Sequence, residues 1–221
     1  MSRSTRRFLG PVAVAALLLF LLDTWLVLSR RPVPFDIPVA LFLQRLDWGP
    51  LSWWMAATNS VGGYWQALVG LLAILAIWAL DARAGWLTLI GSFASVLDNA
   101  VKPVVARHRP TPDLLHIAAP ATGFSYPSGH AVFYTWLYLL VAFSLAPKIP
   151  APARPVLWMV AFALVCLACA ARVWAGDHWP SDVLGGFLLA LCWCSFVLWL
   201  PERWLPGPSR RWFAWHRWPA A

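Results

Sequence analysis

Six stretches of the sequence are long, apolar and almost free of charge, and they limit the folds that this chain can adopt. They cover residues 8–28, 61–80, 85–105, 130–146, 155–173 and 181–200. A helix that crosses the hydrocarbon core of a bilayer needs about 20 mostly apolar residues. Only 12% of the residues are charged, whereas about a quarter are charged in a typical soluble domain. The sequence therefore predicts an all-α integral membrane bundle of six transmembrane helices, in a single domain over residues 1–221.

A shorter segment between the first two stretches has a different pattern. Its apolar residues recur at helical spacing and polar residues stand among them, as shown by Ile37, Leu41, Phe42 and Leu46 against Asp36, Gln44, Arg45 and Asp47. This pattern is typical of an amphipathic helix that lies in the plane of the membrane surface. We expect such an interfacial helix between the first two transmembrane helices.

Basic and aromatic residues predict the orientation of the bundle. The net charge is +8, and the 17 tryptophans are typical of a protein with rings at both bilayer interfaces. Of the 17 Lys and Arg residues, ten fall on the side of the N-terminus and seven on the other side. The positive-inside rule then places both termini in the cytoplasm. Because topology explains the basic residues, no nucleic-acid partner is predicted.

The cysteines give little indication of chemistry. All of them lie inside apolar stretches: Cys166, Cys169, Cys192 and Cys194. A Cys-x-x-Cys pair without a second ligand pair is weak support for a metal or redox site. We interpret them as packing residues, and we predict no metal, cofactor or disulfide framework.

Polar residues concentrate in three segments that this topology brings to the outer membrane surface. The segments are residues 102–110, 126–130 and 171–182. Ionisable groups at membrane level are costly, and they indicate function by default. The three segments therefore predict a site on the outer face of the bundle.

The cations of these segments indicate a multiply charged anion. Lys102, Arg109 and Arg172 suit phosphate, because guanidinium groups match its oxygens in pairs and an ammonium adds a point charge. Ser128 and Gly129 precede an apolar helix, so backbone N–H groups and one hydroxyl can face the same anion.

Two histidines supply candidate reactive groups. His178 stands four residues before Asp182, which can accept from one ring nitrogen and leave the other with a free lone pair. Such an imidazole is a nucleophile toward phosphorus. His130 stands at a helix start and can protonate the leaving oxygen. A carboxylate beside His178 is expected to raise the pKa of its ring.

These residues resemble the three signature motifs of the type 2 phosphatidic acid phosphatase superfamily, in the same order. The matching runs are Lys102-x6-Arg109-Pro110, Pro127-Ser128-Gly129-His130 and Arg172-x5-His178-x3-Asp182. One departure is Ala171, where the family usually has a serine, so one hydroxyl contact to phosphate is missing.

The resemblance implies six helices with the site at the outer membrane surface. It also implies metal-independent hydrolysis through a phosphohistidine on His178, with Asp182 orienting that ring and His130 acting as acid and then as base. The residues that would hold phosphate are Lys102, Arg109, Ser128, Gly129 and Arg172.

The sequence thus predicts a lipid phosphatase of the bacterial cytoplasmic membrane, acting on the outer leaflet. Candidate substrates are a polyprenyl diphosphate such as undecaprenyl diphosphate, phosphatidate and phosphatidylglycerophosphate. The alternatives are a lipid phosphotransferase on the same fold and a non-catalytic lipid-binding or transport protein. The sequence alone decides neither between these substrates nor on the oligomeric state.

Other charges near the motifs receive simpler interpretations. Asp98 lies one helical turn before Lys102 and is expected to form an ion pair with it. Asp23, in the first apolar stretch, either extends toward the membrane surface or lines a path for the lipid. Three further residues are expected to face water: Arg107, His108 and Asp177.

Overall fold

The computed structural model describes residues 3–118 and 121–201, with side chains from residue 7 onward. Over these ranges the fold is helical throughout, without a strand, which confirms the predicted class. The helices are α1 (Arg3–Ser29), α2 (Asp36–Arg45), α3 (Leu51–Ser60), α4 (Tyr64–Leu80), α5 (Ala82–Ser92), α6 (Ala94–Val105), α7 (Gly129–Leu145), α8 (Arg154–Trp174) and α9 (Pro180–Trp199), with short 3₁₀ turns at Ala146–Lys148 and Ala151–Ala153. The C-terminal arginines counted for the orientation, Arg203, Arg210, Arg211 and Arg217, lie outside the described residues.

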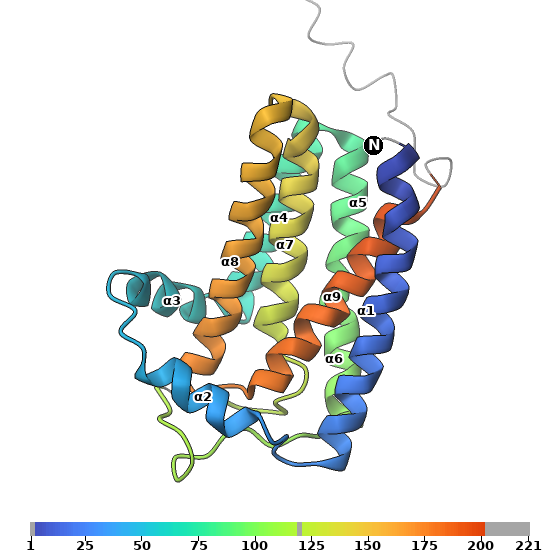
Figure 1. Cartoon of the computed structure of the whole chain (residues 1–221). Helices are drawn as coiled ribbons and strands as arrows, with labels where there is room; N and C mark the ends of the chain where they lie inside the picture. The colour runs from blue at the N-terminus through green and yellow to red at the C-terminus, as the bar shows by residue number, and fades with distance from the viewer. Residues whose placement is uncertain (1–2, 119–120, 202–221) are drawn as a thin grey trace, which may run out of the picture.

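Helix α7 is the centre of the bundle. It packs against α4, α5, α6, α8 and α9, and most of its residues are buried. Helix α1 runs along α9 on one side of the bundle, and α3 projects from the other side (Figure 1). The start of α1 lies at one end of the bundle, while α2, the start of α7 and the start of α9 gather at the opposite end (Figure 1). The three polar segments therefore meet at the end far from the N-terminus.

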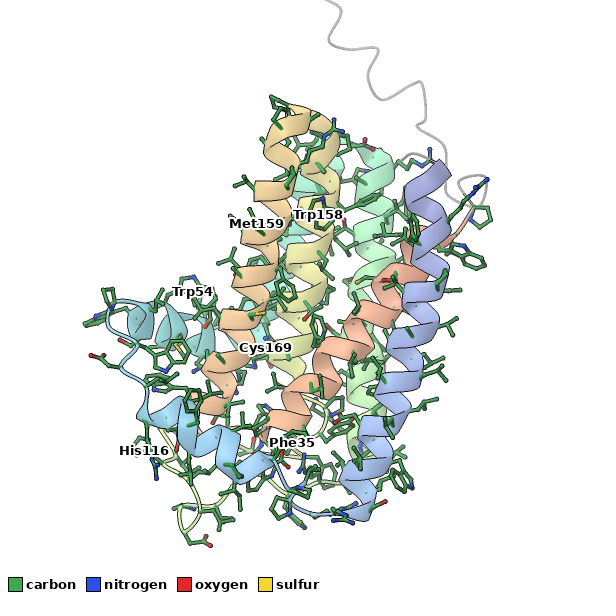
Figure 2. All side chains as sticks on the ribbon, viewed as in Figure 1. Phe35, Trp54, His116, Trp158, Met159 and Cys169 are labelled. Atoms are coloured by element: carbon green, nitrogen blue, oxygen red, sulfur yellow. The ribbon has the colours of Figure 1, made fainter. Side chains whose placement is uncertain are left out.

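Apolar side chains cover the outside of the long helices, as a bilayer requires. On α8, Met159, labelled in Figure 2, is 63% exposed. Phe162 of the same helix is 57% exposed. Large exposed apolar patches of this kind mark a surface that faces lipid or a partner. Four helical segments are long and apolar enough to cross a membrane, or five if the bent pair α3 and α4 forms one span. The chain is a multi-pass membrane protein.

Two of the six predicted helices differ from the prediction. The helix predicted over residues 85–105 is broken at Phe93 into α5 and α6, of 11 and 12 residues. At the break, the Ser92 hydroxyl donates to the Leu89 carbonyl at 2.7 Å and the Phe93 N–H donates to Ile90 at 3.2 Å. The Phe93 bond spans three residues instead of the four of a regular α-helix, and the Ser92 hydroxyl binds a carbonyl of the last turn of α5.

The helix predicted over residues 61–80 begins three residues later, after a sharp bend. Helices α3 and α4 meet at 98° across Val61, Gly62 and Gly63. Gly63 has a φ of 54°, a left-handed conformation that glycine adopts without the steric cost of a side chain. A hydropathy pattern detects the apolar run but not a bend of this kind.

The segment that was predicted to form an interfacial helix is helical in the structure, as α2, and it packs against α8 and α9. Its Asp36 is fully buried and turns toward the bundle. Asp23 of α1 is also buried, at 4% exposure, and accepts a hydrogen bond of 3.0 Å from the Tyr126 hydroxyl. Asp23 therefore does not extend to the surface.

Two glycines of α9 let the segment before α7 approach that helix closely. A Cβ atom at Gly186 would lie 2.6 Å from the Ser128 carbonyl oxygen, and one at Gly185 would lie 2.6 Å from the Tyr126 ring. The Ser128 N–H in turn donates to the Asp182 carbonyl at 2.9 Å. The glycine pair thus sets the distance between the second and third polar segments.

We expect Gly186→Ala to lower the thermal unfolding midpoint of the purified protein in detergent. The added methyl group overlaps the Ser128 backbone, and overpacking of this kind costs about 1–3 kcal/mol. Leu184→Ala, on the exposed face of the same helix, is the matched control and should change the midpoint much less. Equal midpoints for Gly186→Ala and the unaltered protein would contradict this account of the contact.

Candidate active site

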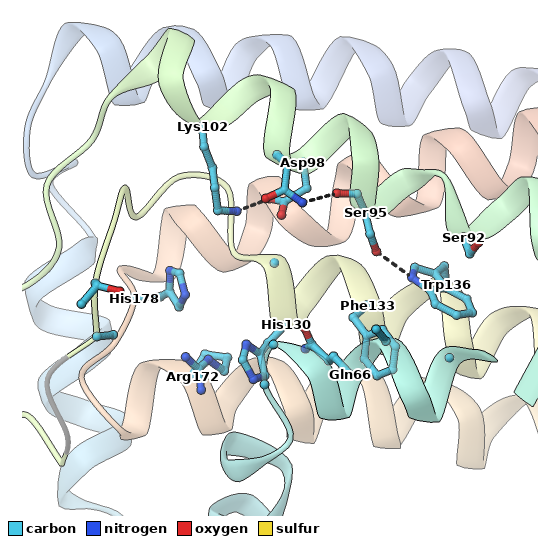
Figure 3. A pocket seen from close by; sticks show the side chains of 18 of the residues that line it. Gln66, Ser92, Ser95, Asp98, Lys102, His130, Phe133, Trp136, Arg172 and His178 are labelled. Atoms are coloured by element: carbon cyan, nitrogen blue, oxygen red, sulfur yellow. Dashed lines mark hydrogen bonds and ion pairs between the residues drawn. The ribbon is translucent and has the colours of Figure 1, made fainter. Parts of the chain in front are cut away.

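The three polar segments border one cavity of about 860 Å³, which continues between α4, α6 and α7 (Figure 3). Six of the eight predicted site residues line it: Lys102, Arg109, Gly129, His130, Arg172 and His178. The other two, Ser128 and Asp182, are fully buried behind its wall. The structure therefore brings together residues that are up to 80 positions apart in the sequence.

His178 lines the cavity, and its two ring nitrogens have different surroundings. Nδ1 is 2.9 Å from the Ser125 carbonyl oxygen and 3.6 Å from Asp182 Oδ2. Both neighbours are acceptors, so the proton resides on Nδ1 and the lone pair on Nε2. Burial lowers the pKa of His178 to about 4, although Asp182 acts in the opposite direction. Asp182 thus raises this pKa as expected, but desolvation is the larger effect and the net shift is downward.

Asp182 is bound more firmly to other donors than to His178. Its Oδ2 accepts from the Trp179 N–H at 2.8 Å and from the Ser125 hydroxyl, and its Oδ1 accepts from Arg107 at 2.6 Å. Ser125 thus contacts both members of the pair, through its hydroxyl and its carbonyl. The carbonyl of Ser125, rather than Asp182 alone, fixes the tautomer of His178.

Arg107 does not face water, contrary to the prediction. It is 1% exposed and binds two carboxylates, Asp36 at 2.5 Å and Asp182 at 2.6 Å. Its Nη1 also donates to the Ser181 hydroxyl at 2.7 Å, and its guanidinium carbon lies 5.6 Å from the centre of the Trp179 ring. Arg107 therefore joins α2, the first polar segment and the start of α9.

Arg172 is oriented from two sides. Its Nη1 donates to Asn59 Oδ1 at 2.8 Å, and its Nη2 forms an ion pair of 2.8 Å with Asp177. Asp177 is 9% exposed, so its interpretation as a solvated loop charge is wrong. Asn59 also donates to the Ala171 carbonyl at 3.1 Å, at the position where the family usually has a serine. These bonds leave the Nε of Arg172 without a partner among the described residues.

The other two cations have different partners. Lys102 forms the predicted ion pair with Asp98, at 2.5 Å, and donates to the Pro127 carbonyl at 2.8 Å. Arg109 donates to backbone carbonyls, including that of Asp177 at 2.8 Å, and its Nη1 lies 3.3 Å from His178 Nε2. Arg109 forms no ion pair with a described carboxylate, so its charge is the one most available to an anion.

Buried polar atoms without partners gather beside the cavity. Within the described residues they include Ser128 Oγ, His130 Nε2 and Arg172 Nε. Buried polar groups in native proteins are almost always hydrogen-bonded, and exceptions indicate a functional role or an unseen ligand. A tetrahedral oxyanion bound between the cations would provide acceptors for these atoms. The Ser128 N–H, which was predicted to face the anion, is instead bonded to the Asp182 carbonyl.

Sequence reasoning missed four residues that position the site: Asp36, Asn59, Arg107 and Ser125. A partial signal existed for two of them, since Asp36 and Arg107 are ionisable groups in segments at membrane level and had no assigned partner. Their pairing could not be read from the sequence, because 71 positions separate them. Asn59 and Ser125 act through bonds that depend on the folded backbone.

The cysteines are free thiols, and three of the four are partly buried or buried. Over residues 3–118 and 121–201, no group of three His, Cys, Asp or Glu side chains is arranged to hold a metal ion.

Known proteins resemble this chain in sequence. The family model described as PAP2 superfamily matches residues 83–206. An undecaprenyl-diphosphatase of Sulfolobus acidocaldarius is 34% identical over 131 residues, which cover 57% of this chain and 58% of the relative. Phosphatidylglycerophosphatase B of Bacillus subtilis is 28% identical over 131 residues, which cover 56% of this chain and 63% of the relative. The chain thus spans less than two thirds of the length of either relative.

The fold also resembles a known one. A crystal structure of a transmembrane PAP2 type phosphatidylglycerolphosphate phosphatase from Bacillus subtilis superimposes with a TM-score of 0.72. The superposition covers 84% of this chain and 94% of that chain, at 21% identity. The likeness concerns the arrangement of the helices.

Removing Arg107 should destabilise the protein strongly. Arg107→Leu leaves Asp36 and Asp182 buried without a cation, and breaking a buried ion pair in this way costs about 3–5 kcal/mol. The thermal unfolding midpoint in detergent measures the effect. Arg31→Leu is the control, because Arg31 is exposed and, among the described residues, its hydrogen bond goes to the Val105 carbonyl. Similar midpoints for the two variants would contradict the role given to Arg107.

His178 should stay neutral well below neutral pH. Burial favours the uncharged ring, so the ring takes up a proton only as the pH falls through about 4, and above that range the Nε2 lone pair is available. A ¹⁵N-histidine NMR titration in micelles measures this, with the signal of His178 identified by its absence in His178→Gln. A midpoint at 6.5 or above would show that desolvation does not dominate.

Proposed function

Because the chain belongs to the PAP2 superfamily, we propose that it is a membrane-embedded lipid phosphatase whose cavity binds the phosphate group between Lys102, Arg109 and Arg172. The observation that carries the proposal is the set of buried polar atoms without partners, among the described residues, beside the cavity that His178 lines. Three cations and a hydroxyl next to an oriented lone pair suit an electrophilic phosphorus with negatively charged oxygens. The names of the two relatives in sequence support the same reaction class.

The proposed reaction has two steps. In the first, Nε2 of His178 attacks phosphorus and the bond from phosphorus to the lipid oxygen breaks, while His130 donates a proton to that oxygen. In the second, His130 accepts a proton from a water molecule, whose oxygen attacks phosphorus and breaks the bond to His178. Inorganic phosphate leaves, and both histidines return to their initial state.

The cations of the site take the role of a metal ion in this mechanism. Negative charge grows on the phosphoryl oxygens as the bond to the lipid breaks, and fixed positive groups stabilise it without reorganisation. Arg109 supplies charge that no described carboxylate neutralises, while Asn59 and Asp177 orient Arg172. We therefore propose that hydrolysis needs no divalent cation.

The proposed substrates are lipid phosphates or diphosphates: a polyprenyl diphosphate, phosphatidate or phosphatidylglycerophosphate. The cavity continues between helices whose outer surfaces are apolar, so the lipid chains can remain in the bilayer while the phosphate reaches the site. Transfer to water rather than to a second lipid is the reaction that we propose.

We further propose six membrane crossings, with α3 and α4 forming one and α5 and α6 another, and α2 at the membrane surface. The orientation would place the N-terminus in the cytoplasm and the site on the outer face of the bacterial inner membrane. Support comes from Figure 1, in which the N-terminus lies at one end of the bundle and the start of α7 and the end of α8, whose residues border the cavity, lie at the opposite end. Basic residues at the end of the bundle far from the site also support it: Arg7, Arg83, Lys148 and Arg154. The proposed cytoplasmic C-terminus lies outside the described residues.

The test is phosphate release from the three lipid classes by the purified full-length protein. His178→Ala should abolish release, because the nucleophile is lost, and a chelator should leave the rate of the unaltered protein nearly unchanged. His108→Ala is the matched control, since His108 is an exposed histidine of the first polar segment. Release that persists in His178→Ala, or that stops with chelator and returns with a divalent ion, would contradict the proposal.

A further inference from the structure

The cavity continues past the two histidines, and one polar side chain in that part has no partner. Gln66 of α4 lines the cavity, and its Nε2 is buried without a hydrogen-bond partner in the part of the chain that the structure describes. None of the signature motifs includes Gln66, which also precedes the stretch that the family model matches. An amide buried without a partner beside an open cavity indicates a ligand atom at that position.

The register of α4 against α7 fixes the level of Gln66 along the cavity. A Cβ atom at Gly62 would lie 3.5 Å from His130 Cε1, and one at Gly70 would lie 3.3 Å from the Trp136 ring. Gln66 and Gly70 are four residues apart on α4 and lie on one face of that helix. Gly62 precedes the helix, in the bend. Gln66 therefore lies between the level of His130, which faces Gly62, and the level of Trp136, which faces Gly70 (Figure 3).

The in-line geometry of phosphoryl transfer places the leaving group on the side of the cavity where Gln66 lies. Figure 3 shows His178, His130, Gln66 and Trp136 in this order along the cavity. In an in-line displacement, the nucleophile and the leaving oxygen lie on opposite sides of phosphorus. An attack from His178 expels the lipid toward His130, so the atoms that follow the leaving oxygen reach the level of Gln66.

The charges of the lining residues indicate which part of a lipid substrate fits beside Gln66. All described cations that line the cavity belong to its phosphate end: Lys102, Arg109 and Arg172. Beyond them the polar lining residues of α6 are Ser95, Asn99 and Asp98, and Asp98 is paired with Lys102. A lipid diphosphate would place its second, charged phosphate beside neutral polar groups and a carboxylate, without a further cation, whereas phosphatidate would place neutral ester oxygens there.

We propose that Gln66 donates a hydrogen bond to the leaving group next to the scissile oxygen and makes the site prefer a glycerolipid phosphomonoester over a lipid diphosphate. This inference rests on the proposed phosphatase function. Gln66 acts here as a specificity-determining residue, because it contacts the part of the lipid in which the two substrate classes differ.

The experiment compares kcat/KM for phosphatidate and for a polyprenyl diphosphate in the same mixed micelles. The unaltered protein should prefer phosphatidate. Gln66→Lys places a cation at the level of a second phosphate, and we expect it to shift the ratio toward the diphosphate by about tenfold or more. Gln66→Leu should lower kcat/KM for phosphatidate by about tenfold and affect the diphosphate less.

Tyr64→Lys is the matched control for charge. Tyr64 lies two residues away on the same helix and is 94% exposed, so its lysine variant adds the same charge outside the cavity. The substrate ratio of this variant should equal that of the unaltered protein. If Gln66→Lys does not fold, as judged by its thermal midpoint, the selective loss in Gln66→Leu decides the question.

The outcomes separate the two proposals. If the unaltered protein hydrolyses both lipids but the ratio does not respond to either Gln66 variant, the inference about Gln66 is wrong and the phosphatase function stands. A preference of the unaltered protein for the diphosphate also overturns the inference. If the unaltered protein releases phosphate from neither lipid, the proposed function itself is wrong.

Discussion

The site depends on one buried guanidinium group that binds two carboxylates. Arg107 contacts Asp36 at 2.5 Å and Asp182 at 2.6 Å, and both carboxylates are fully buried. Asp36 also accepts from the N–H and the hydroxyl of Ser181, at 3.0 and 2.6 Å. Buried charges are tolerated only when their remaining hydrogen bonds are satisfied. Since these bonds come from α2, from the segment after α6 and from the start of α9, the docking of α2 and the position of Asp182 depend on each other.

The same network explains how a neutral histidine can stand close to an ionised carboxylate. Asp182 receives hydrogen bonds from Arg107, the Trp179 N–H and the Ser125 hydroxyl, which stabilise its negative charge. It lies 3.6 Å from the Nδ1 of His178, so it does not need the proton of that ring. Desolvation then decides the charge of His178 and lowers its pKa to about 4. A neutral imidazole with a free lone pair thus results from burial together with a carboxylate that is already well supplied with donors.

The sequence predicted the parts of the protein that depend on local pattern. Apolar runs located α7, α8 and α9 within a residue or two, and the motifs identified the residues that meet at the cavity. The predictions for Arg107 and Asp177 were wrong because the exposure of a charged loop residue depends on its distant partners. The break at Phe93 and the bend before α4 were not predicted because each depends on a few backbone bonds or one φ angle, while the hydropathy of the run stays the same.

Because of the bend between α3 and α4, residues on its two sides act at different ends of the cavity. Asn59, before the bend, binds the Nη1 of Arg172 at the phosphate end, and Gln66, after it, reaches the part of the cavity beyond His130. The helices meet at 98°, and Gly63 has the positive φ that this change of direction requires. A straight helix would place residues seven apart about two turns from each other on one face, so Asn59 could not turn toward α8 while Gln66 packs beside α7. One glycine therefore lets a segment outside the three motifs both orient Arg172 and place Gln66 in the wall of the cavity.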